Sequence, residues 1–386
     1  MSRPLAVIVG AGIAGLSTAW WLDQAGWDSI IIERASSLRE NGYIITLCGL
    51  CLGTLERMGL RERLGTAACA FNENAFRDNK GRELLRLSYR DIMRDIPFIN
   101  LRRSELVRVL ADALPATASI RFNETVDEVI EHGDKVEVKL SSGDRVTADL
   151  LVGADGFRSV VRPYVANESL EPLGYRMAVY DIQSDLDLEP DCVSFTAPGH
   201  LDVFYRLPGE RLVALNIWRD DNTEAETRPR DDRFALLQQV CRGSHSQVQD
   251  ILEFAKEGGP TPVIDSLTLV NPPAWSKGRT VLIGDAAFCL TLLSGQGAGM
   301  TLVASEVLGD ALKSSSNISH ALSEYERKMR PAIARLQTRV RSMAAMYVPK
   351  SPAAFHARNL FLRVVPRSLL ARFHRTAIEN EISSTK

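Results

Sequence analysis

The sequence predicts an α/β fold with a discontinuous Rossmann-type dinucleotide-binding domain, a second domain built on an antiparallel sheet, and C-terminal helices. Three observations lead to this prediction. Apolar runs typical of buried parallel strands, at 5–9, 150–152 and 281–283, each lead into a glycine-containing loop. Polar and apolar residues alternate between turn signals from 176 to 218. Arginines are interleaved with Phe and Leu from 353 to 377, as in basic amphipathic helices.

Residues 5–33 have the order strand, glycine turn, helix and strand that binds dinucleotides. Gly10, Gly12 and Gly15 form G-x-G-x-x-G between the first strand and the helix. The first glycine permits a tight turn, the second lets the backbone approach a pyrophosphate, and the third lets helix and strand pack closely. Glu33 ends the second strand, 18 residues after Gly15, where a carboxylate can accept a hydrogen bond from a ribose hydroxyl. This segment therefore predicts a dinucleotide site.

Two later segments also lead from a buried strand into a glycine. Residues 150–152 run into Gly-Ala-Asp-Gly, in which Asp155 either contacts the ligand or caps the following helix. Residues 281–283 run into a Gly-Asp pair, and the glycine-rich stretch 295–299 then opens a long helix. Free backbone N–H groups and the positive end of a helix dipole suit an anionic ligand there.

These three motifs, in this order, resemble the class A flavoprotein monooxygenases, the p-hydroxybenzoate hydroxylase family, from Leu5 to about Arg341. The stretches "RENGYIITLCGL", "LERMGL" and "SGQGAGMTLVASEVL" resemble its tetracycline-oxygenase-like branch. The resemblance implies FAD as cofactor and NADPH or NADH as transient co-substrate. It also implies a flavin C4a-hydroperoxide that hydroxylates or epoxidises an aromatic, polyketide-like or other natural product, such as an antibiotic. No catalytic side chain is expected, because the flavin carries the chemistry.

The resemblance also assigns residues to the cofactor. Arg103 would face the FAD phosphate and ribose, Asp285 would hold the ribityl or pyrophosphate portion, and 295–299 would face the isoalloxazine ring. Arg39 matches a basic position linked to NADPH or flavin contact, although it is equally interpreted as a solvated surface charge. The predicted cofactor-binding residues are Gly10, Ala11, Gly12, Ile13, Ala14, Gly15, Glu33, Arg34, Arg39, Arg103, Val126, Asp155, Gly156, Gly284, Asp285, Gly295, Gln296, Gly297, Ala298 and Gly299.

Two positions depart from the family pattern. Leu292 stands where many members have a proline, and Thr46 stands where the branch often has Asp. Both departures bear on loop geometry and flavin mobility. Predicted substrate contacts are Ile45, His200, Arg206 and Leu293; His200 is alternatively a surface residue in a turn between strands.

The predicted domains interleave along the chain. The FAD-binding domain comprises 1–70, 100–165 and 276–345, the substrate domain 71–99 and 166–275, and a C-terminal helical segment 346–386. In the last segment, Pro366 divides two basic amphipathic helices. Such helices either lie on a membrane or cover the protein's own core.

Cys48 and Cys51 form C-x-x-C, a spacing found in thiol–disulfide redox centres. A flavin–dithiol oxidoreductase is therefore one alternative function. The sequence has no second G-x-G-x-x-G for NADPH, which favours small buried thiols instead. Another alternative is an FAD-binding protein that no longer hydroxylates and only shields a reactive molecule. The sequence shows no hydrolase or metalloprotease motif, and we predict no metal site.

The composition of the chain limits the kinds of partner that we expect. The chain has 386 residues and a net charge of −2, which gives no reason to expect nucleic acid as a partner. No apolar run reaches the roughly 18 residues that a membrane span needs. Six cysteines in a chain of this length do not form a disulfide framework. We expect a soluble cytoplasmic monomer or homodimer that acts on a small molecule and O₂.

Overall fold

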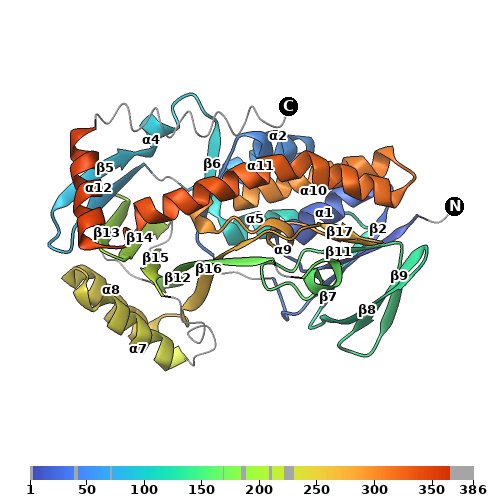
Figure 1. Cartoon of the computed structure of the whole chain (residues 1–386), viewed down its shortest axis with the longest axis horizontal. Coiled ribbons are helices and arrows are strands. Elements are labelled where there is room, and N and C mark those ends of the chain that lie inside the picture. The colour runs from blue at the N-terminus through green and yellow to red at the C-terminus, as the bar shows by residue number, and fades with distance from the viewer. Residues whose placement is uncertain are drawn as a thin grey trace.

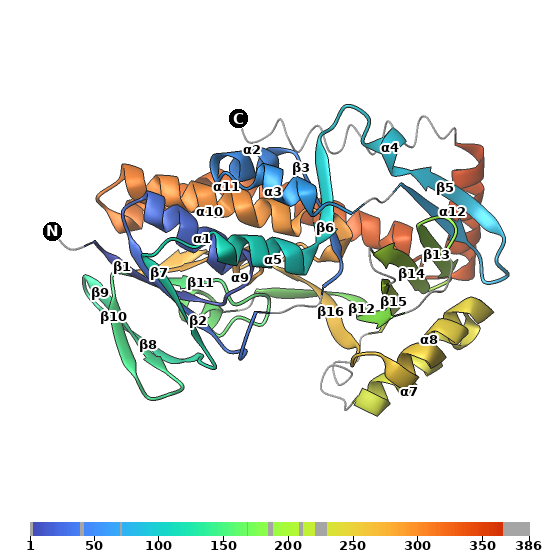
Figure 2. The same cartoon turned by 180° about the vertical axis from the view of Figure 1, so that it is seen from behind.

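The computed structural model describes residues 3–38, 42–69, 72–167, 169–183, 188–207, 211–220 and 230–365. Two large sheets lie at opposite ends of an elongated molecule, and two long helices run between them (Figures 1 and 2). This arrangement confirms the predicted α/β fold class with parallel and antiparallel sheets and C-terminal helices.

The first sheet has six strands in the order β17-β18-β11-β1-β2-β7, and all of its neighbours except β17 and β18 pair in parallel. The strands are β1 (Leu5–Val9), β2 (Asp28–Glu33), β7 (Ala118–Phe122), β11 (Leu150–Gly153), β17 (Ser276–Lys277) and β18 (Thr280–Leu282). The central strands are buried almost throughout, because other elements cover both faces of the sheet. The predicted strands are confirmed to within one residue at each end.

Helices α1 (Ile13–Gln24), α5 (Arg103–Asp112) and α10 (Gly297–Ser314) cover one face of this sheet. A three-stranded antiparallel sheet, β8 (Val126–His132), β9 (Lys135–Leu140) and β10 (Arg145–Ala148), lies on the other. Helices α1 and α10 approach closely, because a Cβ on Gly309 would lie 2.8 Å from the Cβ of Trp21. The hydroxyls of Ser17 and Ser305, 2.7 Å apart, join the same two helices.

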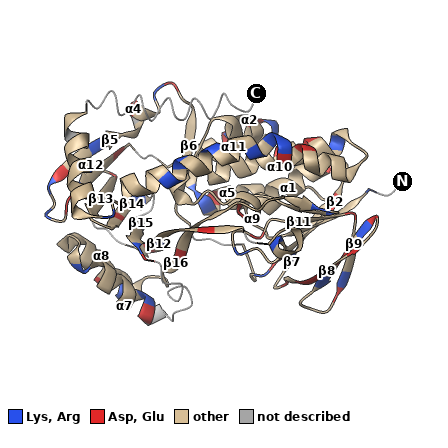
Figure 3. Ribbon diagram, in the orientation of Figure 1, with Lys and Arg blue, Asp and Glu red and all other residues tan. Residues whose placement is uncertain are grey.

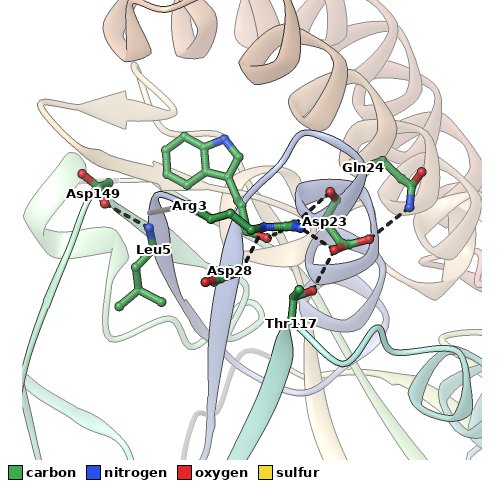
Figure 4. A network of polar contacts seen from close by, with 8 residues as sticks. Arg3, Leu5, Asp23, Gln24, Asp28, Thr117 and Asp149 are labelled. Carbon is green, nitrogen blue, oxygen red and sulfur yellow. Dashed lines mark hydrogen bonds and ion pairs between the residues drawn. The ribbon is translucent and has the colours of Figure 1, made fainter. Parts of the chain in front are cut away.

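The amino ends of β1 and β2 are fixed by a polar network (Figure 4). Arg3 donates to Asp23 at 2.8 Å and pairs with Asp28 at 3.0 Å. The backbone N–H of Leu5 donates to Asp149 at 2.9 Å. The opposite, carboxyl edge of the sheet is where parallel α/β sheets bind ligands.

The second sheet has seven strands in the order β16-β12-β15-β14-β13-β4-β5, antiparallel except for the parallel pair β13–β4. Its strands are β4 (Glu73–Arg77), β5 (Glu83–Ser88), β12 (Leu170–Gln183), β13 (Cys192–Ala197), β14 (His200–Leu207), β15 (Arg211–Arg219) and β16 (Val263–Val270). We call the face that carries Leu201, Val203 and Tyr205 the inner face, and the face that carries Asp202 and Phe204 the outer face. Helices α7 (Arg230–Val240) and α8 (Ser246–Gly258), joined by the 3-10 turn η2 (Cys241–Gly243), cover the outer face.

Shorter elements connect the two sheets. Strands β3 (Ile44–Cys48) and β6 (Phe98–Arg102) form a two-stranded sheet. Helices α2 (Leu50–Arg57) and α3 (Arg61–Thr66) follow β3 in the chain. The remaining short helices are α4 (Tyr89–Ile92), α6 (Arg162–Val165), α9 (Asp285–Phe288) and the 3-10 turn η3 (Leu292–Ser294).

Helix α11 (Ile318–Tyr347) ties the two sheets together and is followed by α12 (Pro352–Val364) (Figure 1). The hydroxyl of Tyr325 donates to the Leu282 carbonyl in the first sheet at 3.2 Å. The Gln337 amide donates to the Val270 carbonyl in the second sheet at 2.7 Å. One continuous helix therefore sets the spacing between the sheets.

The first of the two predicted C-terminal amphipathic helices corresponds to α12, which packs on the protein. Phe355 is buried, and Arg358 donates to the Thr196 hydroxyl at 3.1 Å. Burial lowers the pKa of Arg358 to about 10. These contacts favour a helix that covers the protein's own core, and the segment from Pro366 on lies outside the described residues.

Basic and acidic residues are interspersed along the described elements (Figure 3). Within the described ranges, no helix is both long and apolar enough to span a bilayer.

Candidate active site

The carboxyl ends of four neighbouring parallel strands bring the predicted glycine motifs together. We call this region the nucleotide edge: residues 10–15 after β1, Glu33 at the end of β2, 153–156 after β11, and 284–285 after β18. Backbone hydrogen bonds continue the strand pairing into the loops, for example from the Ala154 N–H to the Val9 carbonyl at 2.9 Å. Segments more than 120 residues apart in the chain thus form one continuous surface.

The three glycines of the first motif meet three different constraints. Gly10 has a φ of +105°, and a Cβ there would lie 2.6 Å from the Ala154 carbonyl oxygen. A Cβ on Gly15 would lie 1.9 Å from the Gly10 carbonyl oxygen, so helix and turn pack at backbone distance. At Gly12, no described atom lies within 4 Å of the Cβ position. The open side of Gly12 is where a ligand can approach the backbone.

The amino end of α1 faces this open space. Its N-cap is Gly12, which has no side chain, and its first turn holds no acidic residue. The first N–H groups and the positive end of the helix dipole are thus left for an anion, as the pyrophosphate of a dinucleotide requires. Glu33 supports the turn, accepting from the N–H groups of Ala11 at 2.8 Å and Ala35 at 2.9 Å. Arg34 is exposed, and Ala11, Ile13 and Ala14 are buried.

Asp155 in the second motif has the predicted capping contacts and keeps one carboxylate oxygen available. Its Oδ2 accepts from the N–H groups of Val160 at 2.7 Å and Val161 at 3.3 Å, which is the capping role. Its Oδ1 is buried without a partner among the described residues. Burial raises the pKa of this carboxyl, against hydrogen bonds from Ser159 and the backbone that lower it. Gly156, next in the chain, has a φ of +82° and turns the loop. The free Oδ1 leaves one acceptor at the nucleotide edge for a ligand hydroxyl.

Asp285 starts α9 and lies close to Arg103 at the start of α5. Burial raises the pKa of Asp285, while the charge of Arg103 and a hydrogen bond from Cys289 act in the opposite direction. Arg103 donates to the Tyr43 hydroxyl at 3.3 Å. Interaction with Tyr43 raises the pKa of Arg103; burial opposes this, and Asp285 reinforces it. The pair therefore offers one carboxylate and one guanidinium to a polar ligand.

Gly284 fixes Asp285 in place. It has a φ of +61°, and a Cβ there would lie 2.9 Å from the Cβ of Ala14 in α1 and 3.3 Å from Thr301 in α10. Residue 284 is thus the point where α1, α9 and α10 meet. Both the φ and the close contacts require glycine at this position.

The loop before α10 has the predicted glycine-rich geometry. Gly295 is left-handed with a φ of +65°, and no described atom lies within 4 Å of the Cβ positions of Gly295 and Gly297. Helix α10 starts after Gln296 without a side-chain cap and without an acidic first-turn residue. Ala298 is partly buried against the main core. Like α1, the helix presents free N–H groups and a positive end, which suits the negative charge of a reduced flavin ring.

Thr291 precedes Leu292, the position at which many family members have a proline. The φ of Thr291, +55°, is unusual for a β-branched residue, and its hydroxyl accepts from the Leu293 N–H at 3.3 Å. At the other departure from the family pattern, Thr46 donates to the Asn100 side chain at 2.8 Å, which joins β3 to β6.

Cys48 and Cys51 are not joined by a disulfide in this structure, and both side chains are buried. Cys51 donates to the Cys48 carbonyl at 3.1 Å, and its Sγ lies 3.1 Å from the position of a Cβ on Gly299. The Gln296 amide donates to the Cys48 sulfur at 3.5 Å. Burial, reinforced by Cys48, raises the pKa of Cys51 to about 12, so this thiol stays protonated at neutral pH.

The predicted substrate contacts fall on different sides of the molecule. Leu293 is buried among inner-face residues, next to the loop before α10. Ile45 packs against the core of the first sheet, whereas its neighbour Ile44 packs on the inner face. His200 and Arg206 belong to the alternate, outer-face positions of β14, on the opposite face of the sheet from Leu293 and Ile44. His200 is only 7% exposed, so the alternative of a surface turn residue is wrong.

Two residues outside the predicted set, Ile44 and Tyr205, join β3 to the inner face. The Ile44 N–H donates to the Tyr205 hydroxyl at 3.0 Å. Successive side chains on a strand point to opposite faces, so Ile44 and Ile45 lie on opposite faces of β3, and Tyr205 and Arg206 on opposite faces of β14. This alternation is the sequence feature that could have indicated Ile44 and Tyr205. Val126 is buried in the core where β8 begins, and Arg39 lies outside the described residues.

A parallel sheet whose carboxyl edge carries three glycine motifs and two uncapped helix starts defines a dinucleotide-binding protein. Comparison with known proteins makes this class specific. A protein-family model described as "FAD binding domain" matches residues 5–340. A flavin-dependent monooxygenase of Phoma sp, eupH, is 29% identical over 89% of this chain and 88% of its own length. A flavin-dependent monooxygenase of Legionella longbeachae is 25% identical, with 86% of both chains covered.

Solved structures share the fold. The tetracycline destructase Tet(51) superposes with a TM-score of 0.83 at 23% identity, over 100% of this chain and 99% of its own. Klebsiella pneumoniae HpxO, in complex with FAD and uric acid, gives 0.82 at 22% identity, over 97% of both chains. The chain belongs to the FAD-binding-domain family of flavoprotein monooxygenases, and it is an FAD-dependent monooxygenase. The predicted family and cofactor are thereby confirmed.

Proposed function

We propose that the enzyme uses NAD(P)H and O₂ to hydroxylate or epoxidise a small aromatic, polyketide-like or other natural-product molecule. In this reaction NAD(P)H supplies two electrons, one oxygen atom enters the substrate, and the other leaves as water. Bound FAD would supply the oxygen activation, by the C4a-hydroperoxide route predicted above. The protein's own part is to bind, orient and exclude water.

The described residues fit FAD. The open side of Gly12 and the uncapped start of α1 would hold the pyrophosphate, and Glu33 the nucleotide ribose. Asp285 and Arg103 would hold the polar chain between the pyrophosphate and the ring. The uncapped start of α10 would face the ring. The division into FAD-binding, substrate and C-terminal segments is part of this proposal.

Our proposal for the substrate class rests on a partly exposed apolar strip on the inner face of the seven-stranded sheet. Met177 of β12, Leu215 of β15 and Val203 of β14 lie on neighbouring strands and are only partly buried. The same three residues pack against two buried inner-face clusters, one with Ile44 of β3 and one with Leu293. An apolar surface left open between two buried clusters, beside the predicted flavin loop, suits a largely apolar ring-shaped substrate. This strip is our candidate substrate floor.

The names of relatives support the same class of substrate. Tet(51) is a tetracycline destructase, and one HpxO structure holds uric acid; both compounds are ring systems. The Phoma relative is likewise a flavin-dependent monooxygenase. Among the alternatives, the buried, protonated Cys51 argues against the flavin–dithiol oxidoreductase.

A substrate screen tests the proposal. Purified FAD-loaded enzyme should oxidise NADPH or NADH faster when its substrate is added, with matching O₂ consumption and a product heavier by one oxygen atom. Accelerated NAD(P)H oxidation that yields only hydrogen peroxide with every bound compound would instead favour the protein that binds without hydroxylating. The same screen decides between NADPH and NADH.

A further inference from the structure

A buried cluster of metal-ligating side chains lies on the outer face of the seven-stranded sheet. His200 and Asp202 come from β14, and Cys241 from the turn η2 between α7 and α8. One ligand atom from each of the three lies within 4.8 Å of the others. Asp202 and Cys241 are fully buried, and His200 is 7% exposed. The cluster is on the opposite face from the candidate substrate floor, so the proposed oxygenation does not use it.

The spacing of the ligand atoms is close to that of a tetrahedral metal site. Cys241 Sγ lies 3.8 Å from His200 Nε2 and 3.7 Å from Asp202 Oδ1. Bonds of zinc to nitrogen, oxygen and sulfur at tetrahedral angles separate such atoms by about 3.3–3.6 Å. The separation of His200 and Asp202, 2.5 Å as a hydrogen bond, and that of Asn216 and Asp202, 2.6 Å, have to widen on metal binding. The two separations from the Cys241 sulfur have to shorten slightly.

Asn216 provides a second, independent observation. It is fully buried on β15 directly opposite Asp202, and its Oδ1 has no hydrogen-bond partner among the described residues. Its Nδ2 lies 2.6 Å from Asp202 Oδ1 and 3.8 Å from Cys241 Sγ. The amide oxygen and nitrogen are interchangeable by a half-turn of the group. That half-turn would place the amide oxygen beside Asp202 and Cys241 as a fourth ligand, and the bond to the ion would take the place of the present Nδ2–Asp202 hydrogen bond.

We propose that His200, Asp202, Cys241 and Asn216 bind one divalent transition-metal ion, with zinc the best match. Imidazole, carboxylate and thiolate together suit zinc rather than the oxygen-seeking magnesium or calcium. Cys241 releases its proton on binding, and one thiolate plus one carboxylate balance the two charges of the ion in a buried site. The Ser244 hydroxyl donates to Asp202 Oδ2 at 2.7 Å and orients the carboxylate.

The ion would fasten the α7–η2–α8 cap to the sheet. Cys241 and Ser244 belong to the cap, whereas the other ligands belong to β14 and β15. Ser244 is only partly buried, and Arg242 and Gly243 beside it are exposed, so the site lies near solvent at the cap's turn. This role is structural and independent of the substrate.

Cobalt binding to the FAD-loaded, untagged full-length enzyme tests the proposal. Co²⁺ should bind at one ion per chain and give absorption typical of tetrahedral cobalt, at wavelengths longer than the flavin bands. Zn²⁺ should displace it and raise the melting temperature. Cys241→Ser should weaken Co²⁺ binding at least ten-fold. The matched control is Cys192→Ser, which changes a fully buried cysteine of β13 on the inner face, and this variant should bind Co²⁺ as wild type does.

Measurements on the wild type keep the proposal testable if Cys241→Ser fails to fold. Metal analysis of protein expressed in zinc-supplemented medium should then show zinc, and its removal by a chelator should lower the melting temperature. Wild-type enzyme that contains no zinc and gives no tetrahedral cobalt spectrum would overturn the proposal and leave a hydrogen-bonded cluster. Equal Co²⁺ binding by wild type and Cys241→Ser would overturn it as well.

Discussion

The nucleotide edge and the candidate substrate floor are built from different parts of the chain. At the nucleotide edge, backbone groups and glycines form the surface, and a Cβ on Gly10 or Gly15 would collide with another carbonyl oxygen. On the candidate substrate floor, side chains form the surface, and Met177, Val203 and Leu215 are partly buried on three neighbouring strands. If the proposed floor is correct, cofactor choice is fixed by backbone geometry, whereas substrate choice rests on a few side chains.

The variant with the largest expected effect tests the role of backbone geometry at the nucleotide edge. Gly15→Ala places a methyl group 1.9 Å from the Gly10 carbonyl oxygen, and the turn has to move. We expect destabilisation by about 3 kcal/mol and loss of FAD binding. Denaturant unfolding and flavin content measure both effects.

Gly12→Ala is the matched control, because no described atom lies near its Cβ. We expect this variant to fold with wild-type stability in the absence of FAD and to bind FAD about ten-fold more weakly, a cost of about 1.4 kcal/mol. If both alanine variants lost the same stability, the separate roles assigned to the two glycines would be wrong.

Asp285→Ala removes a carboxylate from the nucleotide edge with little change to the backbone. Loss of a charge-assisted hydrogen bond costs about 1.5–3 kcal/mol, so FAD affinity should fall at least about ten-fold. Titration of the FAD-free protein with FAD measures the change. An unchanged affinity in a folded variant would remove Asp285 from the site.

Leu215→Gln tests the side-chain side of the comparison. A polar amide on the apolar strip should raise KM for the substrate found by the screen about ten-fold, while FAD content stays at the wild-type level. The matched control, Leu360→Gln, makes the same change at an exposed position on α12 and should leave KM unchanged. A loss of FAD from Leu215→Gln with no change in KM would show that the strip supports the cofactor instead.

Cys48→Ser combined with Cys51→Ser tests whether the two sulfurs act chemically. We expect the double variant to retain FAD and turnover, because neither thiol is needed for oxygen transfer. A buried hydroxyl that lacks a partner costs about 1–3 kcal/mol, so the melting temperature should fall. Suppose instead that the wild type cycles two thiols and that the folded, FAD-loaded double variant shows no turnover. That result would favour the flavin–dithiol oxidoreductase.

The smallest effect concerns the contact between α11 and the second sheet. Arg341 donates to Glu171 at 2.7 Å and lowers the pKa of this half-exposed carboxyl. A carboxyl with a lowered folded-state pKa stabilises the fold above its unfolded pKa of about 4.3, and this contribution is lost as the pH falls through the folded value. Glu171→Gln should therefore destabilise by about 0.2–1 kcal/mol at pH 7 and by less in acid. Urea unfolding at both pH values checks the sign.

The sequence predicts the nucleotide edge well, because its signals are local. Strand, glycine turn and helix follow one another within a few residues, so Gly10, Gly12, Gly15 and Glu33 could be assigned without tertiary information. The inner and outer faces of the second sheet depend instead on strand register. The pairing of β14 with its neighbours places His200 on the outer face and Tyr205 on the inner face, and no local motif indicates this.

The cap and its cluster could not be predicted for a related reason. Cys241 joins His200 and Asp202 only because the chain between them folds back over the outer face. Cys241 lies 41 positions after His200 and 39 positions after Asp202 in the sequence. No metal-binding spacing connects the three residues, so the sequence alone indicates no metal site.

Oxygen transfer to the identified substrate tests the central claim most directly. Enzyme reduced by NAD(P)H and then exposed to isotopically labelled O₂ should place one labelled oxygen atom in each product molecule, with one NAD(P)H consumed. Leu215→Gln should do so at a lower rate at limiting substrate. Product oxygen that comes from water, or NAD(P)H oxidation that yields only hydrogen peroxide with the substrate bound, would contradict the account.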